Sequence, residues 1–180
     1  MKGFIIKSNQ KYPDFYHRLF REMAVMKQYN WLISDFEVGG MGREYKRKNK
    51  FGYMERYHWL TGEEFAAVAE ENNCYWSWAV YSAFNSHISR TDVLEYDSPC
   101  ADGNPNLWKN PVSIQHPLAE IEIVAWDGAY KLFLCKDDVI ADIFMKTFPA
   151  CENLEIYNRR LNGEIDDSEA LEEWYRKKGV

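Results

Sequence analysis

Residues Ala119 to Tyr157 read AEIEIVAWDGAYKLFLCKDDVIADIFMKTFPACENLEIY, and this stretch decides the fold class. Alternating apolar and polar residues flank Asp127-Gly128, a dipeptide that favours the tight turn of a β-hairpin. On the first strand of that hairpin, Ile121 and Ile123 share one side, and Glu120 and Glu122 point to the other. The pattern therefore predicts two antiparallel strands joined at Asp127-Gly128.

A helix and one more strand are predicted after the hairpin. Apolar residues recur at helical spacing from Asp137 or Asp138 up to Pro149, which ends the helix. Its predicted inner face comprises Val139, Ile140, Ile143, Phe144 and Phe148. Leu154 and Ile156 then alternate with polar residues and predict a last strand.

The first half of the chain shows the same kinds of element. Helices are predicted from Pro13 and from Thr61, where Glu64 completes a capping box. Strands are predicted over 3–7, 29–38, 51–59 and 74–84. Hairpins mixed with helical crossovers favour an α+β fold, a single-layer and mostly antiparallel sheet with helices packed mainly on one face.

Length and composition limit the class of protein. At 180 residues, with 46% hydrophobic and 28% charged residues, the chain suits a single domain over 1–180. The net charge of −6 argues against general nucleic-acid binding, which needs clustered cations to neutralise phosphates. The N-terminal apolar run is far too short for a signal peptide or a membrane span, so we expect a cytoplasmic protein without membrane contact.

Catalytic and metal-binding motifs are absent from the sequence. It contains no nucleotide-binding glycine loop, serine-hydrolase elbow, zinc-protease or kinase motif. The cysteines lie far apart without a C-x-x-C pair, which favours reduced thiols over a zinc site; they are Cys74, Cys100, Cys135 and Cys151. We therefore expect no metal and no cofactor, assign no catalytic residue, and favour a non-enzymatic role.

Function is expected in segments without regular periodicity. Residues 39–50 form a predicted flexible basic loop, and 85–117 a long irregular loop. Residues 162–180 form a predicted acidic tail with a short helix. Between the two loops, the strand over 74–84 is aromatic on both sides, which predicts either a central strand or a strand with one binding face.

Two parts of the chain carry a family resemblance. They are KGFIIKSNQKYPDFYHRLFREM with YNWLISDFE, and DGAYKLFLCKDDVIADIF. In their order of strand, helix and hairpin they resemble a family of small bacterial proteins classed as a domain of unknown function. This resemblance covers about two thirds of the chain, and it implies a bacterial α+β domain without catalytic residues to transfer.

The favoured functional hypothesis is a protein-binding module, for instance of immunity or antitoxin type, that neutralises a cationic protein partner. Aromatic anchors with charged rims are the usual anatomy of a protein interface. The candidate partner-binding residues are Trp76, Trp78, Asp92, Asp97, Asp102, Trp108, Glu172, Glu173 and Trp174.

The alternative hypothesis is a small-molecule enzyme or sensor. An anionic ligand would bind between the aromatic strand and the basic loop, held by Arg43, Lys46 or Arg47. A structural or regulatory module whose charges only confer solubility also stays open at this point.

Overall fold

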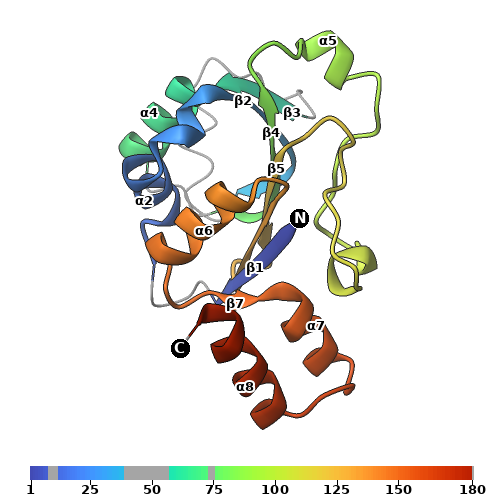
Figure 1. Cartoon of the computed structure of the whole chain (residues 1–180). Helices are drawn as coiled ribbons and strands as arrows, with labels where there is room; N and C mark the ends of the chain where they lie inside the picture. Colours follow the sequence, from blue (N-terminus) through green and yellow to red (C-terminus); the bar gives the residue numbers. More distant parts are fainter. Residues whose placement is uncertain (8–11, 39–56, 73–75, 180) are drawn as a thin grey trace.

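The computed structural model describes residues 1–7, 12–38, 57–72 and 76–179 (Figure 1). In this part of the chain, one seven-stranded sheet has the order β3-β2-β4-β5-β6-β1-β7, and its neighbouring strands pair antiparallel. The strands are β1 (Lys2–Lys7), β2 (Tyr29–Val38), β3 (Tyr57–Thr61), β4 (Trp76–Asn85), β5 (Ile121–Trp126), β6 (Tyr130–Cys135) and β7 (Glu152–Asn153). The predicted α+β class with an antiparallel sheet is confirmed.

Helices connect strands that flank a common neighbour. Strands β3 and β4 both pair with β2 and are linked by α4, while β6 and β7 both pair with β1 and are linked by α6. Figure 1 shows α2, α4 and α6 together on one face of the sheet, as predicted. The helical elements are α2 (Phe15–Glu22), η1 (Ala24–Gln28), α4 (Gly62–Asn72), α5 (Arg90–Val93), η2 (Pro105–Trp108), α6 (Asp138–Thr147), α7 (Leu154–Leu161) and α8 (Asp167–Lys178).

The predicted hairpin forms as β5 and β6. Its turn places both Asp127 and Gly128 at positive φ, 48° and 61°, which is the conformation that this dipeptide favours. Ile121 and Ile123 join the core beneath the helices, while Glu122 lies on the opposite face of the sheet. The period-two pattern thus assigned these residues to the correct faces.

The core under the helices is rich in stacked aromatic rings. Phe144 of α6 lies on Phe133 of β6, with ring centroids 3.8 Å apart and an interplanar angle of 8°. Two residues of the predicted inner face of α6 lie elsewhere, because Val139 is 68% exposed and Ile143 is 36% exposed. The prediction for these two residues is wrong: the apolar stripe of α6 is narrower and centres on Ile140, Phe144 and the following Phe148.

The second face of the sheet is covered mostly by chain without regular secondary structure. Ala101, Leu107 and Val112 pack against sheet residues such as Val80 and Val124. The irregular segment 85–117 therefore buries one face of β4 and β5 with α5 and η2 as its short helices. Strand β4 is a central strand whose residues 79–84 are buried, which fits the apolar residues that it presents to both faces of the sheet.

The last predicted strand is a helix in the structure. Strand β7 consists of Glu152 and Asn153 alone, and Leu154 begins α7. The side-chain oxygen of Asn153 accepts a hydrogen bond from the backbone N–H of Ile156 at 3.0 Å and so caps α7. Leu154 and Ile156 are buried as predicted, but on a helix, because the cap at Asn153 ends the extended chain.

The acidic tail forms α8 and the turn before it. Asp166 caps α8 in a capping box with Glu169, and basic residues gather in its last turn, so the charges follow the helix dipole. Arg159 of α7 binds Glu173 of α8 at 2.7 Å, and Arg160 lies 3.7 Å from Asp167. Several tail acids therefore join α8 to α7.

Gly62 lies at the start of α4, where the backbone of η1 passes close by. A Cβ atom built on Gly62 would overlap the backbone of Lys27. We expect G62A to lower the free energy of unfolding by roughly 3 kcal/mol in urea denaturation, because backbone atoms must move to make room. The neighbouring exposed Glu63 gives the control, because E63A should change the free energy of unfolding by less than about 0.5 kcal/mol. Equal effects of both variants would contradict the close approach of the Lys27 backbone to Gly62.

Candidate functional site

A set of partly exposed aromatic rings lies on the second face of the sheet. We call it the aromatic surface, and it comprises Trp78, Trp108, Trp126, Tyr130 and Tyr157. These residues come from β4, η2, β5, β6 and α7, so segments far apart in the sequence build it together. All of them are half-buried, which leaves part of each ring in contact with solvent.

Trp126 lies at the centre of a continuous set of ring contacts. Its centroid is 4.8 Å from that of Trp78 and 5.0 Å from that of Trp108, and both pairs are edge-to-face. Trp108 continues the array to Tyr130 at 6.2 Å and Tyr157 at 6.1 Å. These spacings are those of favourable aromatic pairs, so the rings hold one another in place.

Trp108 is anchored by the short helix η2 that carries it. The preceding Leu107 is buried, and its carbonyl accepts a hydrogen bond from Asn158 Nδ2 of α7 at 3.4 Å. Asn158 Nδ2 also donates to Asn110 Oδ1 at 3.3 Å. Hydrogen bonds from α7 therefore fix both sides of the turn on which Trp108 stands.

Two cations already lie against one ring of the aromatic surface. Lys7 Nζ is 6.0 Å and Arg160 Cζ 5.1 Å from the centroid of Tyr157. Burial is the largest cause, and the hydrogen bond with Tyr130 the second, that raises the pKa of Tyr157 to about 12. Its phenol is therefore neutral at physiological pH. The surface is thus able to bind cations through ring faces without a charged phenolate.

The structure brings together part of the predicted partner-binding set. Trp78 and Trp108 belong to the aromatic surface, and Asp102 is exposed beside Ala101, which packs in the same cluster. Sequence reasoning missed the roles of Trp126, Tyr130 and Tyr157. The signal for Trp126 was available, because parity places it on the same side of β5 as Glu122 and Val124.

The other predicted partner-binding residues lie apart from the aromatic surface. Asp92 caps α5 by accepting hydrogen bonds from Ser89, and Asp97 is exposed after that helix. Glu172 is exposed on α8, and Glu173 pairs with Arg159. Trp174 is only 8% exposed, because its ring packs on that of Phe4 with centroids 6.2 Å apart.

The remaining candidate residues belong to the predicted basic loop and to the start of strand β4. Arg43, Lys46 and Arg47, with the rest of the predicted basic loop over 39–50, lie outside the described residues, as does the side chain of Trp76. The anionic-ligand hypothesis that depends on them stays a prediction.

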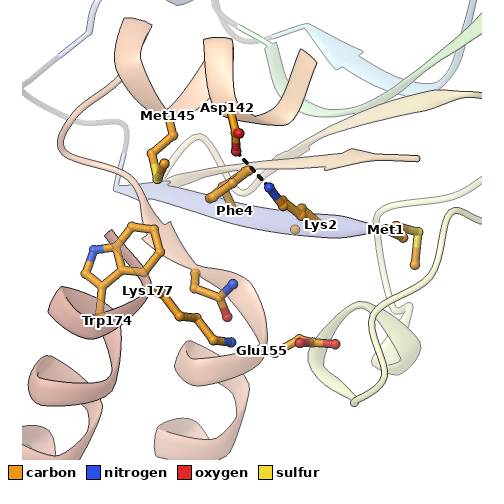
Figure 2. Close-up of a pocket in the computed structure, with 10 residues that line it drawn as sticks. Met1, Lys2, Phe4, Asp142, Met145, Glu155, Trp174 and Lys177 are labelled. Atoms are coloured by element: carbon orange, nitrogen blue, oxygen red, sulfur yellow. Dashed lines mark hydrogen bonds and ion pairs between the residues drawn. The ribbon is translucent and has the colours of Figure 1, made fainter. Parts of the chain in front are cut away.

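A separate pocket of about 280 Å³ opens between β1 and helices α6, α7 and α8 (Figure 2). One wall is apolar and comprises Phe4, Met145 and Trp174. The rest of the lining carries charges of both signs on Lys2, Asp142, Glu155 and Lys177. Lys2 Nζ binds Asp142 Oδ1 at 2.7 Å, the ion pair drawn as a dashed line in Figure 2.

A buried carboxyl group ties the irregular segment to the sheet. Glu122 of β5 is fully buried and accepts hydrogen bonds from Gln115 N at 3.1 Å and Gln115 Nε2 at 3.0 Å. The side-chain oxygen of Gln115 accepts from Cys100 N at 3.0 Å and from Asn104 Nδ2 at 2.9 Å. Burial raises the pKa of Glu122 to about 7, so this group titrates near neutral pH.

The three described cysteine thiols all have raised pKa values. Burial raises the pKa of Cys135 to about 11 and that of Cys151 to about 12, which keeps both thiols protonated. Cys100 is exposed, but partial desolvation of its thiol raises its pKa, and the nearby Asp35 charge raises it further. Among the described residues, His, Cys, Asp and Glu side chains do not gather in a group that could hold a metal ion.

Helices long and apolar enough to cross a membrane are likewise not found within the described ranges. Comparisons of the chain with protein-family models, with characterised proteins and with solved structures give no match, so the family resemblance drawn from the sequence stays a prediction.

Proposed function

We propose that this protein is a non-enzymatic binding module, of the immunity or antitoxin type, that holds a cationic segment of a protein partner on its aromatic surface. The observation that carries the proposal is the continuous array of half-buried rings centred on Trp126. Tryptophan is the best ring partner for a cation and a frequent anchor at protein interfaces.

Charge favours a cationic partner over an anionic one. The exposed Asp127 directly follows Trp126, and the exposed Asp102 follows Ala101, which packs in the same cluster as the rings. The net charge of −6 adds a long-range attraction for cations and speeds their association at low salt. A partner presenting arginine or lysine side chains would therefore be steered to the protein and held by the rings.

The position of Tyr157 supports the same chemistry. Lys7 and Arg160 of the chain itself already lie over its ring. Among the described cations, none lies over Trp78, Trp108 or Trp126. The three tryptophans thus offer partly exposed rings for arginine or lysine side chains of a partner.

Peptide titration tests this proposal. We expect a hexa-arginine peptide to bind, followed by the change in tryptophan fluorescence, and a hexa-glutamate peptide not to bind. W108L and W126L should each weaken hexa-arginine binding by roughly fivefold, since leucine keeps apolar contact but removes the ring face that attracts the cation. Binding should also weaken as salt is raised.

Trp59 provides the matched control, because it lies in a different cluster, 5.7 Å from Phe84 between ring centroids. W59L should bind hexa-arginine like the wild type. Equal binding of the two peptides, or equal losses in W59L and W108L, would overturn the aromatic surface as a site for cations.

A further inference from the structure

The pocket between β1, α6, α7 and α8 contains one ion pair that is already complete. Lys2 Nζ lies 2.7 Å from Asp142 Oδ1 and 3.8 Å from Asp138 Oδ1. The charge of Lys2 is therefore neutralised by acidic side chains of the protein itself. The charged groups left to meet a ligand are Glu155 and Lys177.

Glu155 and Lys177 face the pocket from two different helices. Figure 2 shows the Lys177 side chain of α8 extending below β1 in the direction of Glu155 on α7, whose carboxylate points away from Lys177. Within the described part of the chain, Glu155 takes part in none of the ion pairs, and Lys177 is paired only at 3.8 Å with Glu173. Glu173 is itself held more closely by Arg159, at 2.7 Å.

An apolar wall lies beside these two charges. Phe4 and Trp174 form a tilted ring pair, and Met145 adds a flexible side chain near them in Figure 2. Thioether and aromatic side chains adapt well to apolar groups of different shape. The pocket therefore combines a carboxylate, an ammonium group and an apolar wall.

The size of the pocket limits what it can hold. At about 280 Å³ it lies just below the range of roughly 300–1,000 Å³ that is usual for ligand sites, so it suits a small ligand better than a nucleotide or a large cofactor. The pocket lining contains two lysines and two acids. The acids would repel a purely anionic ligand and the lysines a purely cationic one, so neither is favoured.

We propose that this pocket binds a small zwitterion with an apolar side chain, an α-amino acid of the size of leucine, methionine or phenylalanine. The ligand carboxylate pairs with Lys177, its ammonium group pairs with Glu155, and its side chain lies against Phe4, Met145 and Trp174. This site shares none of its residues with the aromatic surface, so its test is separate from that of the proposed function.

Calorimetric titration of the full chain with L-leucine, leucinamide and N-acetylleucine tests the assignment. Leucine should bind, and each analogue should bind more weakly because it lacks one of the two charges. K177Q should weaken leucine binding by roughly fivefold and leave leucinamide binding unchanged. E155Q should weaken leucine binding by a similar factor and leave N-acetylleucine binding unchanged.

Matched substitutions at exposed positions separate this result from a general charge effect. K146Q on α6 and E172Q on α8 should bind leucine like the wild type, and thermal melts should confirm that all four variants are folded. Absence of binding for leucine, methionine and phenylalanine overturns the proposal. Equal losses for leucine and leucinamide in K177Q also overturn it, since the lysine would then not contact the carboxylate.

Discussion

Replacing Phe144 by alanine (F144A) is expected to lower the free energy of unfolding by about 3–5 kcal/mol. Phe144 is fully buried, and its ring lies against Phe133 at 3.8 Å and Phe148 at 4.8 Å between centroids. Truncation removes the apolar area of one ring and leaves a cavity between α6 and the sheet, and rigid neighbouring rings fill such a cavity poorly. Urea denaturation followed by circular dichroism measures the loss.

The exposed Val139 on the same helix is the control for this measurement. V139A should change the free energy of unfolding by less than about 0.5 kcal/mol, because 68% of the valine surface is exposed. A loss in V139A as large as in F144A would mean that α6 packs on the sheet through another face. The pair therefore tests the corrected orientation of the helix as well as the core.

Local sequence signals were sufficient for the central hairpin. Strict alternation along β5 and β6 assigns side chains to faces without any knowledge of the fold, and Asp127-Gly128 adopts the positive φ angles that define the turn. The cap of α4 was equally local: Glu64 Oε2 accepts hydrogen bonds from Thr61 N at 2.8 Å and Thr61 Oγ1 at 2.9 Å. Such features depend on residues close in the sequence, so the sequence alone predicts them.

The start of α7 shows where local signals compete. Leu154 and Ile156 alternate as in a strand, but Leu154, Tyr157 and Leu161 fit helical spacing equally well. The strand partner of Asn153 is Phe4, nearly the whole chain away, and pairing extends no further than Ile5 with Glu152. Whether the chain continues as a strand or turns into a helix thus depends on contacts that a sequence window does not contain.

The aromatic surface was predictable only in part for the same reason. Trp78 was identified from its strand, and Trp108 was named in an irregular segment, but nothing local indicated that both meet Trp126. Their meeting depends on the pairing of β4 with β5 and on the return of η2 across that face. The pocket lined by Glu155 and Lys177 likewise requires α7 and α8 to pack beside β1.

The substitution E122Q is expected to remove a pH dependence of stability that the buried Glu122 creates. The pKa of Glu122 is raised by burial from 4.5 to about 7 in the folded protein, so between these values the folded state binds more protons than the unfolded state. The stabilisation is therefore fully present below pH 4.5 and is lost as pH rises through about 7. The loss amounts to roughly 3 kcal/mol.

Glutamine resembles the protonated acid, because it keeps one carbonyl oxygen to accept a hydrogen bond from Gln115 and carries no charge. E122Q should thus match the wild type near pH 4.5 and become the more stable protein by up to roughly 3 kcal/mol above pH 8. Burial also lowers the pKa of the neighbouring His116, so the folded protein loses stability as pH falls below 6.5. Because both proteins contain this histidine, its contribution cancels in the difference between their free energies of unfolding.

Urea denaturation of both proteins at several pH values measures this difference. E172Q supplies the same chemical change at an exposed position of α8 and serves as the control. If the difference between E122Q and the wild type is constant between pH 4.5 and 8, Glu122 is not the titrating group that couples the irregular segment to the sheet. If it grows with pH, the cost of ionising Glu122 in its buried position destabilises the folded protein, although the hydrogen bonds from Gln115 favour the charged form and offset part of that cost.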